Sequence, residues 1–175
     1  MPANREGICR FAREEFTSDD IPKLLAAMRS TPYDRAESLF TYGPYLLMQH
    51  GIEMPEVREE LDRLLGHESR FVRVNTICAL DGGNPFTTDE VWSTSEIADA
   101  FAVPRLIQEC EKERQRGGYT GDASTVLADI AFRRPEYTAQ ILPVIIDSVI
   151  SYPYSMNRPL RRIYRIAKLA PDAAL

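Results

Sequence analysis

The feature that most constrains this chain is a pair of helical patterns within residues 55–80. The first, residues 55–65, places apolar side chains at the spacing of a single helix face: Val57, Leu61, Leu64 and Leu65. The second, residues 70–80, spreads apolar side chains around most of the helix. The short turn Gly66-His67-Glu68 joins the two. A helix that is apolar on several sides must be covered from several sides, so this hairpin predicts a stacked array of helices.

The ends of the second helix carry capping signals. Ser69 is a residue type favoured at an N-cap, and Gly82-Gly83 is typical of the end of a helix. We therefore expect the helix to begin just after Ser69 and to end just before Gly82.

Three further stretches repeat this hairpin pattern. The four expected repeats cover approximately residues 18–51, 52–83, 97–134 and 135–172. Three of their first helices open with a proline in second place: Pro22, Pro104 and Pro143. Proline suits the first helical turn, because the amide hydrogen it lacks would have no partner there. Pro143 has an alternative place inside a helix that begins near Tyr137, which it would then kink.

Two departures interrupt the repeats. Gly43-Pro44 predicts a break in the second helix of the first repeat, with the following residues forming a separate or kinked segment. The spacing between Ser69 and the next matching cap, Asp122, exceeds one repeat. We assign the excess to an insertion at residues 81–102.

The pattern Ser69-x-x-Val72-Arg73-x-x-Thr76-x-x-Ala79-Leu80 resembles the second helix of the HEAT-like repeat family, including its PBS-lyase-type version. Thr76 stands where the family usually has a small alanine. The resemblance covers roughly residues 18–172, closely in one repeat and loosely in three. It implies an all-α fold in which residues 1–175 form a single domain: an α-solenoid of about four stacked antiparallel hairpins in a right-handed superhelix. A generic bundle of antiparallel helices is the alternative.

The composition fits a soluble folded protein. Of the 175 residues, 44% are hydrophobic and 27% are charged. No apolar run approaches the roughly 20 residues needed to cross a bilayer, and the N-terminal residues lack a signal-peptide pattern, so we expect a cytoplasmic protein. The three cysteines are far apart and fit reduced thiols better than disulfides.

No motif predicts catalysis, a cofactor or a metal site. Gly117-Gly118 lacks the lysine and the preceding strand of a phosphate-binding loop. The two histidines are isolated from each other and from the cysteines, unlike the ligands of a zinc site. The acidic pair Asp89-Glu90 fits helix caps better than a cation site.

Two surfaces are candidates for binding a partner. The first is the insertion, which holds acidic and aromatic side chains and no lysine or arginine: Asp81, Phe86, Asp89, Glu90, Trp92, Glu96 and Asp99. Alternatively, Trp92 and Phe86 tuck under the loop and seal the gap between repeats. The second is the expected last helix, with Arg158, Arg161, Arg162 and Arg165. Alternatively, these arginines are the polar outer face that a terminal repeat needs.

Charge and family resemblance together predict a protein-binding function. The net charge is −5, and residues 1–150 alone carry −9, which repels nucleic acid and attracts a basic protein. We expect a non-catalytic binding module with no membrane partner, and the resemblance implies an immunity protein that neutralises a basic bacterial toxin. The alternatives are a HEAT-like enzyme or enzyme subunit of the bilin-lyase or DNA-glycosylase type, and a general adaptor.

Overall fold

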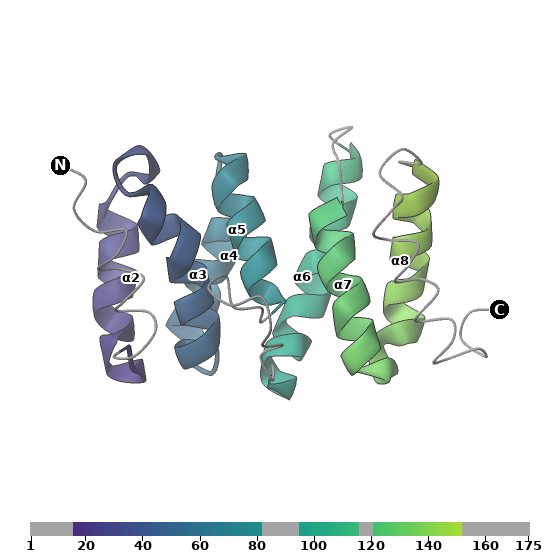
Figure 1. Ribbon diagram of the computed structural model, residues 1–175, viewed down its shortest axis with the longest axis horizontal. Helices are drawn as coiled ribbons and strands as arrows, with labels where there is room; N and C mark the ends of the chain where they lie inside the picture. The colour runs from purple at the N-terminus through teal and green to yellow at the C-terminus, as the bar shows by residue number, and fades with distance from the viewer. Residues whose placement is uncertain (1–15, 82–94, 116–120, 152–175) are drawn as a thin grey trace. The chain divides into compact units, whose positions relative to one another are not determined.

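The computed structural model describes residues 16–81, 95–115 and 121–151, and this part of the chain is built from helices, with no strand (Figure 1). The elements are η1 (Ser18–Asp20), α2 (Ile21–Ser30), η2 (Tyr33–Arg35), α3 (Glu37–Gly51), α4 (Pro55–Leu65), α5 (Arg70–Leu80), α6 (Glu96–Gln115), α7 (Gly121–Arg133), η3 (Pro135–Tyr137) and α8 (Thr138–Ser151). The all-α prediction is therefore confirmed for the described residues. The chain divides into two compact units, Met1–Ala98 and Asp99–Leu175.

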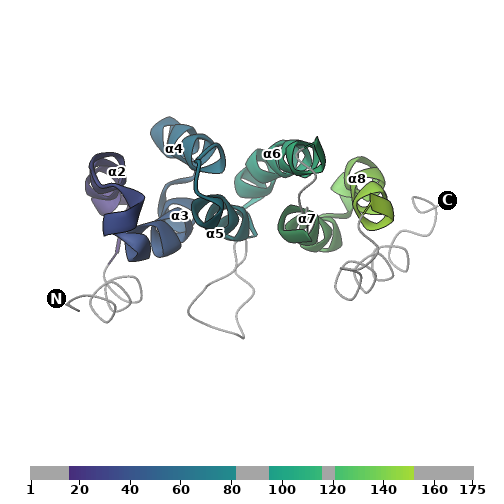
Figure 2. The same ribbon diagram turned by 90° about the horizontal axis from the view of Figure 1, so that it is seen from above.

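The helices of the first unit form two layers. α2 and α4 lie in one layer, and α3 and α5 lie side by side in the other (Figure 2). Each helix of the first layer also packs against its successor in the chain, α2 on α3 and α4 on α5. The apolar stripe predicted for α4 is buried as expected: Val57, Leu61, Leu64 and Leu65.

α3 runs without interruption through Gly43 and Pro44, so the prediction of a separate segment after Pro44 is wrong. Gly43 allows close packing on α2, because a Cβ at this position would lie 2.8 Å from the Sδ atom of Met28 and the end of that side chain would have to shift. Pro44 removes one helical hydrogen bond. Burial of Pro44 and of Leu46 and Leu47 in the core offsets that loss and keeps the helix continuous.

In the second unit, α7 packs against α8, and η3 connects them. Pro143 lies inside α8, as the alternative for this residue predicted. Pro104 lies inside α6 rather than in its first turn, because α6 begins upstream at Glu96. Residues 96–102, assigned to the insertion, are therefore helical. Pro22, by contrast, lies in the first turn of α2 as predicted.

Ser69 occupies the N-cap of α5, although its side chain makes no capping hydrogen bond. Its backbone amide instead donates to Nδ1 of His67 at 3.0 Å. Arg73 then donates to the carbonyl oxygens of His67 and Glu68 at 2.7 and 2.8 Å. Arg73, a residue of α5, thus stabilises the turn between α4 and α5 through these hydrogen bonds.

Candidate protein-binding surface

Most of the residues predicted to bind a partner lie outside the described part of the chain. These are Phe86, Asp89, Glu90 and Trp92 of the insertion, and Arg158, Arg161, Arg162 and Arg165 of the expected last helix. Their roles stay predictions. Asp81, Glu96 and Asp99 are described, and each has a different environment.

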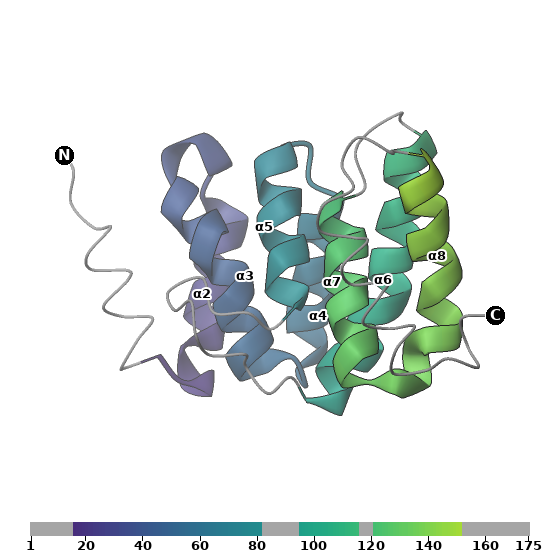
Figure 3. The same cartoon turned by 45° about the vertical axis from the view of Figure 1, so that its right-hand side comes forward.

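Asp81 lies at the C-cap of α5, near Tyr45 of α3. Cys78 of α5 and the charge of Asp81 both raise the pKa of Tyr45 on α3, so the three side chains lie close enough to influence one another. α3 and α5 pack directly against each other, as Figures 1 and 3 show. Asp81 is therefore part of a surface that two helices build together.

Helical spacing adds two residues to this surface. Tyr42 precedes Tyr45 by three residues on α3, and Asn75 precedes Cys78 by three on α5, so each lies on the same helix face as its neighbour. All five side chains are partly exposed. We call this set the α3/α5 face: Tyr42, Tyr45, Asn75, Cys78 and Asp81.

The α3/α5 face offers hydrogen-bonding groups in a partly apolar setting. Burial raises the pKa of Tyr45, and the nearby Cys78 and Asp81 raise it further, so the phenol keeps its proton at neutral pH. The Nδ2 atom of Asn75 is buried and has no hydrogen-bond partner among the described residues. An unsatisfied buried amide costs about 1–3 kcal/mol.

Glu96 and Asp99 differ from each other although both lie in the first turn of α6. Glu96 is exposed, as a partner contact must be. Asp99 is fully buried and accepts hydrogen bonds from Arg133 at 2.9 Å and Arg134 at 3.1 Å. A buried carboxylate held by two arginines is a poor contact for a partner, so we leave Asp99 out of the proposed interface.

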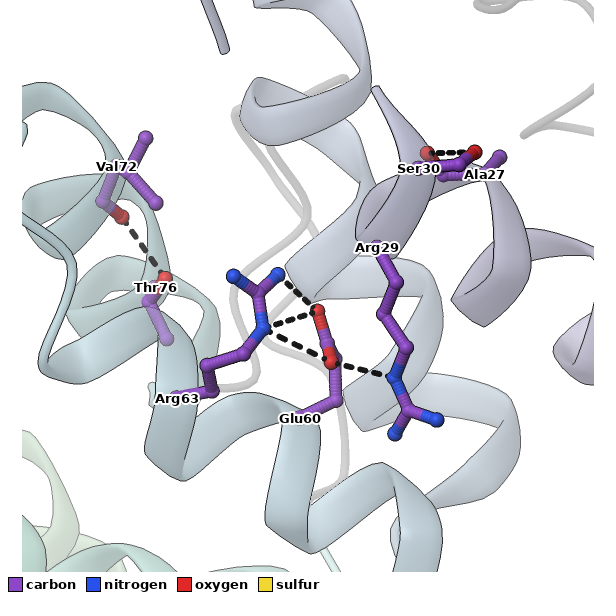
Figure 4. A network of polar contacts seen from close by, with 7 residues as sticks. All are labelled: Ala27, Arg29, Ser30, Glu60, Arg63, Val72 and Thr76. Carbon is purple, nitrogen blue, oxygen red and sulfur yellow. Dashed lines mark hydrogen bonds and ion pairs between the residues drawn. The ribbon is translucent and has the colours of Figure 1, made fainter. Parts of the chain in front are cut away.

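A second buried carboxylate, in the first unit, is absent from the sequence-based predictions. Glu60 of α4 is 1% exposed and lies between Arg29 of α2 and Arg63 of its own helix (Figure 4). Arg29 Nε donates at 3.0 Å and Arg63 Nε at 3.1 Å. Burial by itself would raise the pKa of Glu60, but the hydrogen bonds from the two guanidinium groups outweigh it and lower the pKa. Glu60 therefore stays ionised, and its ion pair with Arg29 links α4 to α2.

Other kinds of site find no support in the described residues. Nowhere in residues 16–81, 95–115 and 121–151 do three or more histidine, cysteine, aspartate or glutamate side chains gather so that they could hold a metal ion. Within the same ranges, no helix combines the length and the apolar character needed to cross a membrane. Burial raises the pKa of Cys110 to about 12, which keeps this thiol protonated and unreactive at neutral pH.

Neither protein-family models, nor curated proteins, nor solved structures give a match to this chain.

Proposed function

We propose that this chain is a non-catalytic protein-binding module built from HEAT-like helical pairs, and specifically an immunity protein that neutralises a basic bacterial toxin. The observation that carries the proposal is the α3/α5 face, a partly exposed surface with two tyrosines that ends at Asp81. Tyrosine is among the residues that contribute most to protein–protein binding, because it combines apolar area with a hydrogen-bonding group. Asp81 is also the first residue of the predicted acidic insertion, so the α3/α5 face and the insertion share this residue.

The arrangement of the first unit supports the helical-repeat part of the proposal. Its four helices pair in chain order, α2 with α3 and α4 with α5, and equivalent helices contact each other between pairs. Stacked pairs of this kind leave one layer free to present a continuous surface.

The charge of the first unit supports a basic partner. Residues 16–81 hold eleven aspartates and glutamates against seven lysines and arginines, a balance of −4. Such a surface speeds the association of an oppositely charged protein and disfavours acidic competitors.

The test begins with the tagged full-length protein as bait in a lysate of its host. A captured protein then has to meet three conditions: a basic isoelectric point, one-to-one binding after separate purification, and toxicity to cells that is relieved by co-expression of this chain. A partner that binds tightly but is harmless would overturn the immunity proposal and leave a general adaptor. Absence of any stoichiometric protein partner would overturn the binding proposal.

Two charge reversals then locate the interface. Asp81→Lys changes the α3/α5 face, whereas Glu59→Lys changes an exposed acid on α4 in the opposite layer. We expect Asp81→Lys to weaken binding of the purified partner about tenfold or more and Glu59→Lys to weaken it less, with thermal unfolding showing that both variants fold. Equal effects would indicate general attraction by net charge and would remove the α3/α5 face from the proposal.

A further inference from the structure

α5 carries a row of partly exposed side chains that continues the α3/α5 face toward the start of the helix. Phe71 is the second residue of α5, and Asn75 and Cys78 follow after four and three residues. Asp81 lies at the C-cap, three residues after Cys78. Residues at these intervals share one helix face, so the row extends over about 15 Å from Phe71 to Asp81. The α3/α5 face thus has Asp81 at one end of α5 and borders Phe71 at the other.

Phe71 belongs to a group of four aromatic rings to which both helical pairs of the first unit contribute. Tyr33 comes from η2, between α2 and α3, and its ring centroid lies 5.6 Å from that of Phe71. His67 comes from the turn between α4 and α5, 6.3 Å from Tyr33. Phe40 of α3 is 1% exposed and lies 6.0 Å from both Tyr33 and His67. We call these four residues the aromatic cluster, and all of them except Phe40 are partly exposed.

The layer of α3 and α5 presents few charged side chains, unlike the layer of α2 and α4 (Figure 2). α4 exposes charged side chains along its length: Glu56, Glu59, Asp62 and Arg63. Within the described helices α3 and α5, by contrast, the charged residues are Glu37 and Arg70, the first residue of each helix, and Arg73. Arg73 is held by the carbonyl oxygens of the turn before α5. The centre of a protein–protein interface is depleted in charged residues and enriched in aromatic ones, as this layer is.

The two ends of this surface favour different groups on a partner. The carboxylate of Asp81 attracts a basic side chain. The aromatic cluster offers ring surface, and burying an apolar side chain against it is favourable. Because the rings of Tyr33, His67 and Phe71 already pack on one another or on Phe40, a partner that binds them has few new side chains to order.

We propose that the α3/α5 face and the aromatic cluster together recognise a protein element that carries an apolar and a basic side chain about 15 Å apart. The apolar side chain packs on Tyr33 and Phe71, and the basic one pairs with Asp81. About ten residues of a helix or about five of a strand cover this distance. This inference rests on the proposed protein-binding function and specifies the chemistry of the partner at the same surface.

Two small probes test this surface on the full-length protein without a partner. N-acetyl-leucinamide supplies the apolar side chain and N-acetyl-argininamide the basic one, and shifts of the backbone amide signals in nuclear magnetic resonance spectra locate each probe. We expect the leucine probe to shift the amides of Tyr33, His67 and Phe71, and the arginine probe to shift that of Asp81. Phe71→Ala and Asp81→Asn should each abolish the response to one probe only. Shifts at the same end for both probes, or at neither end, would overturn the inference.

The purified partner from the test of the proposed function gives a second measurement. We expect Phe71→Ala to weaken binding about tenfold or more at both low and high salt. Asp81→Asn should weaken it mainly at low salt, because salt screens the attraction between charges. Tyr137→Ala is the matched control, since this partly exposed aromatic residue lies in the second unit, and it should leave binding unchanged.

Thermal unfolding shows whether each variant folds, and Tyr33→Ala replaces Phe71→Ala if the latter does not. A partner that binds the folded Phe71→Ala or Tyr33→Ala variant as tightly as the natural chain would overturn this inference and leave the proposed function in place. Absence of any partner would overturn both. The two failures are therefore distinguishable.

Discussion

Within the described residues, a carboxylate of each unit is buried between two arginines, but the two arrangements differ in where the arginines come from. Glu60 forms ion pairs with Arg63 of its own helix and with Arg29 of α2. Asp99 on α6 forms ion pairs with Arg133, the last residue of α7, and with Arg134, which directly follows it. The arginine side chains are also exposed to different extents, 50% for Arg29 and 20% for Arg133. The first carboxylate thus keeps a local partner if the helices separate, and the second loses both.

The free-energy cost of breaking such a cluster depends on which partners remain around the buried charge. A buried ion pair adds little stability over an apolar core, yet removing one partner leaves a charge without compensation. The Asp99 cluster should therefore be more sensitive to changes at the end of α7 than the Glu60 cluster is to changes in α2.

The largest effect is expected for the double change Arg133→Ala and Arg134→Ala. It removes two ion-pair partners of the buried Asp99 and should lower the free energy of unfolding by about 3–5 kcal/mol. Urea unfolding measures the loss. The control removes two exposed arginines of the first unit, Arg35 and Arg70, and should change stability by less than about 1 kcal/mol. Similar losses in both double variants would mean that Asp99 does not need its partners.

The sequence predicted the helices better than it predicted these clusters. The spacing of Val57, Leu61 and Leu64 identified α4 and its buried face, because hydrophobic periodicity is a local property. A buried carboxylate with distant partners is not local: Glu60 and Arg29 are 31 residues apart, and Asp99 and Arg133 are 34 apart.

One sequence signal could have identified both acids. Glu60 lies three residues after Val57, and Asp99 lies four before Val103, so each acid shares a helix face with buried apolar residues. Asp99 was instead grouped with the acidic insertion, because the residues around it contain no lysine or arginine. The α3/α5 face was harder to predict from the sequence than either acid, because only the packing of two helices brings Tyr45 close to Cys78.

The next effect in size concerns Glu60→Gln. Glutamine keeps the shape of the side chain but replaces hydrogen bonds to a charged group by neutral ones, so we expect a loss of about 1.5–3 kcal/mol in urea unfolding. Glu59→Gln, one residue earlier and exposed, is the matched control and should be nearly neutral. A neutral or stabilising Glu60→Gln would show that the burial of the charge costs as much as its two arginines contribute.

A smaller loss is expected when only the distant arginine of Glu60 is removed. Arg29→Ala leaves Arg63 in place, so the carboxylate stays paired and the cost should be about 1 kcal/mol. Combining Arg29→Ala with Glu60→Gln in a double-mutant cycle measures the coupling between the two residues. If Arg29→Ala is as damaging as the double change at Arg133 and Arg134, the contrast between a local and a distant partner is wrong.

The smallest effect is the dependence of the Glu60 contribution on pH. The two arginines hold the pKa of Glu60 below its ordinary value in the folded protein, and the unfolded chain has the ordinary value of about 4.3. A lowered folded pKa means that the stabilisation is fully present above the unfolded pKa and is lost as the pH falls through the folded pKa. The difference in unfolding free energy between the natural chain and Glu60→Gln should thus stay constant from about pH 7 to 5 and shrink below about pH 4. Because glutamine does not titrate, this difference isolates Glu60 from the other carboxylates. A difference that persists unchanged to pH 3 would mean that the arginines support the shape of the side chain rather than its charge.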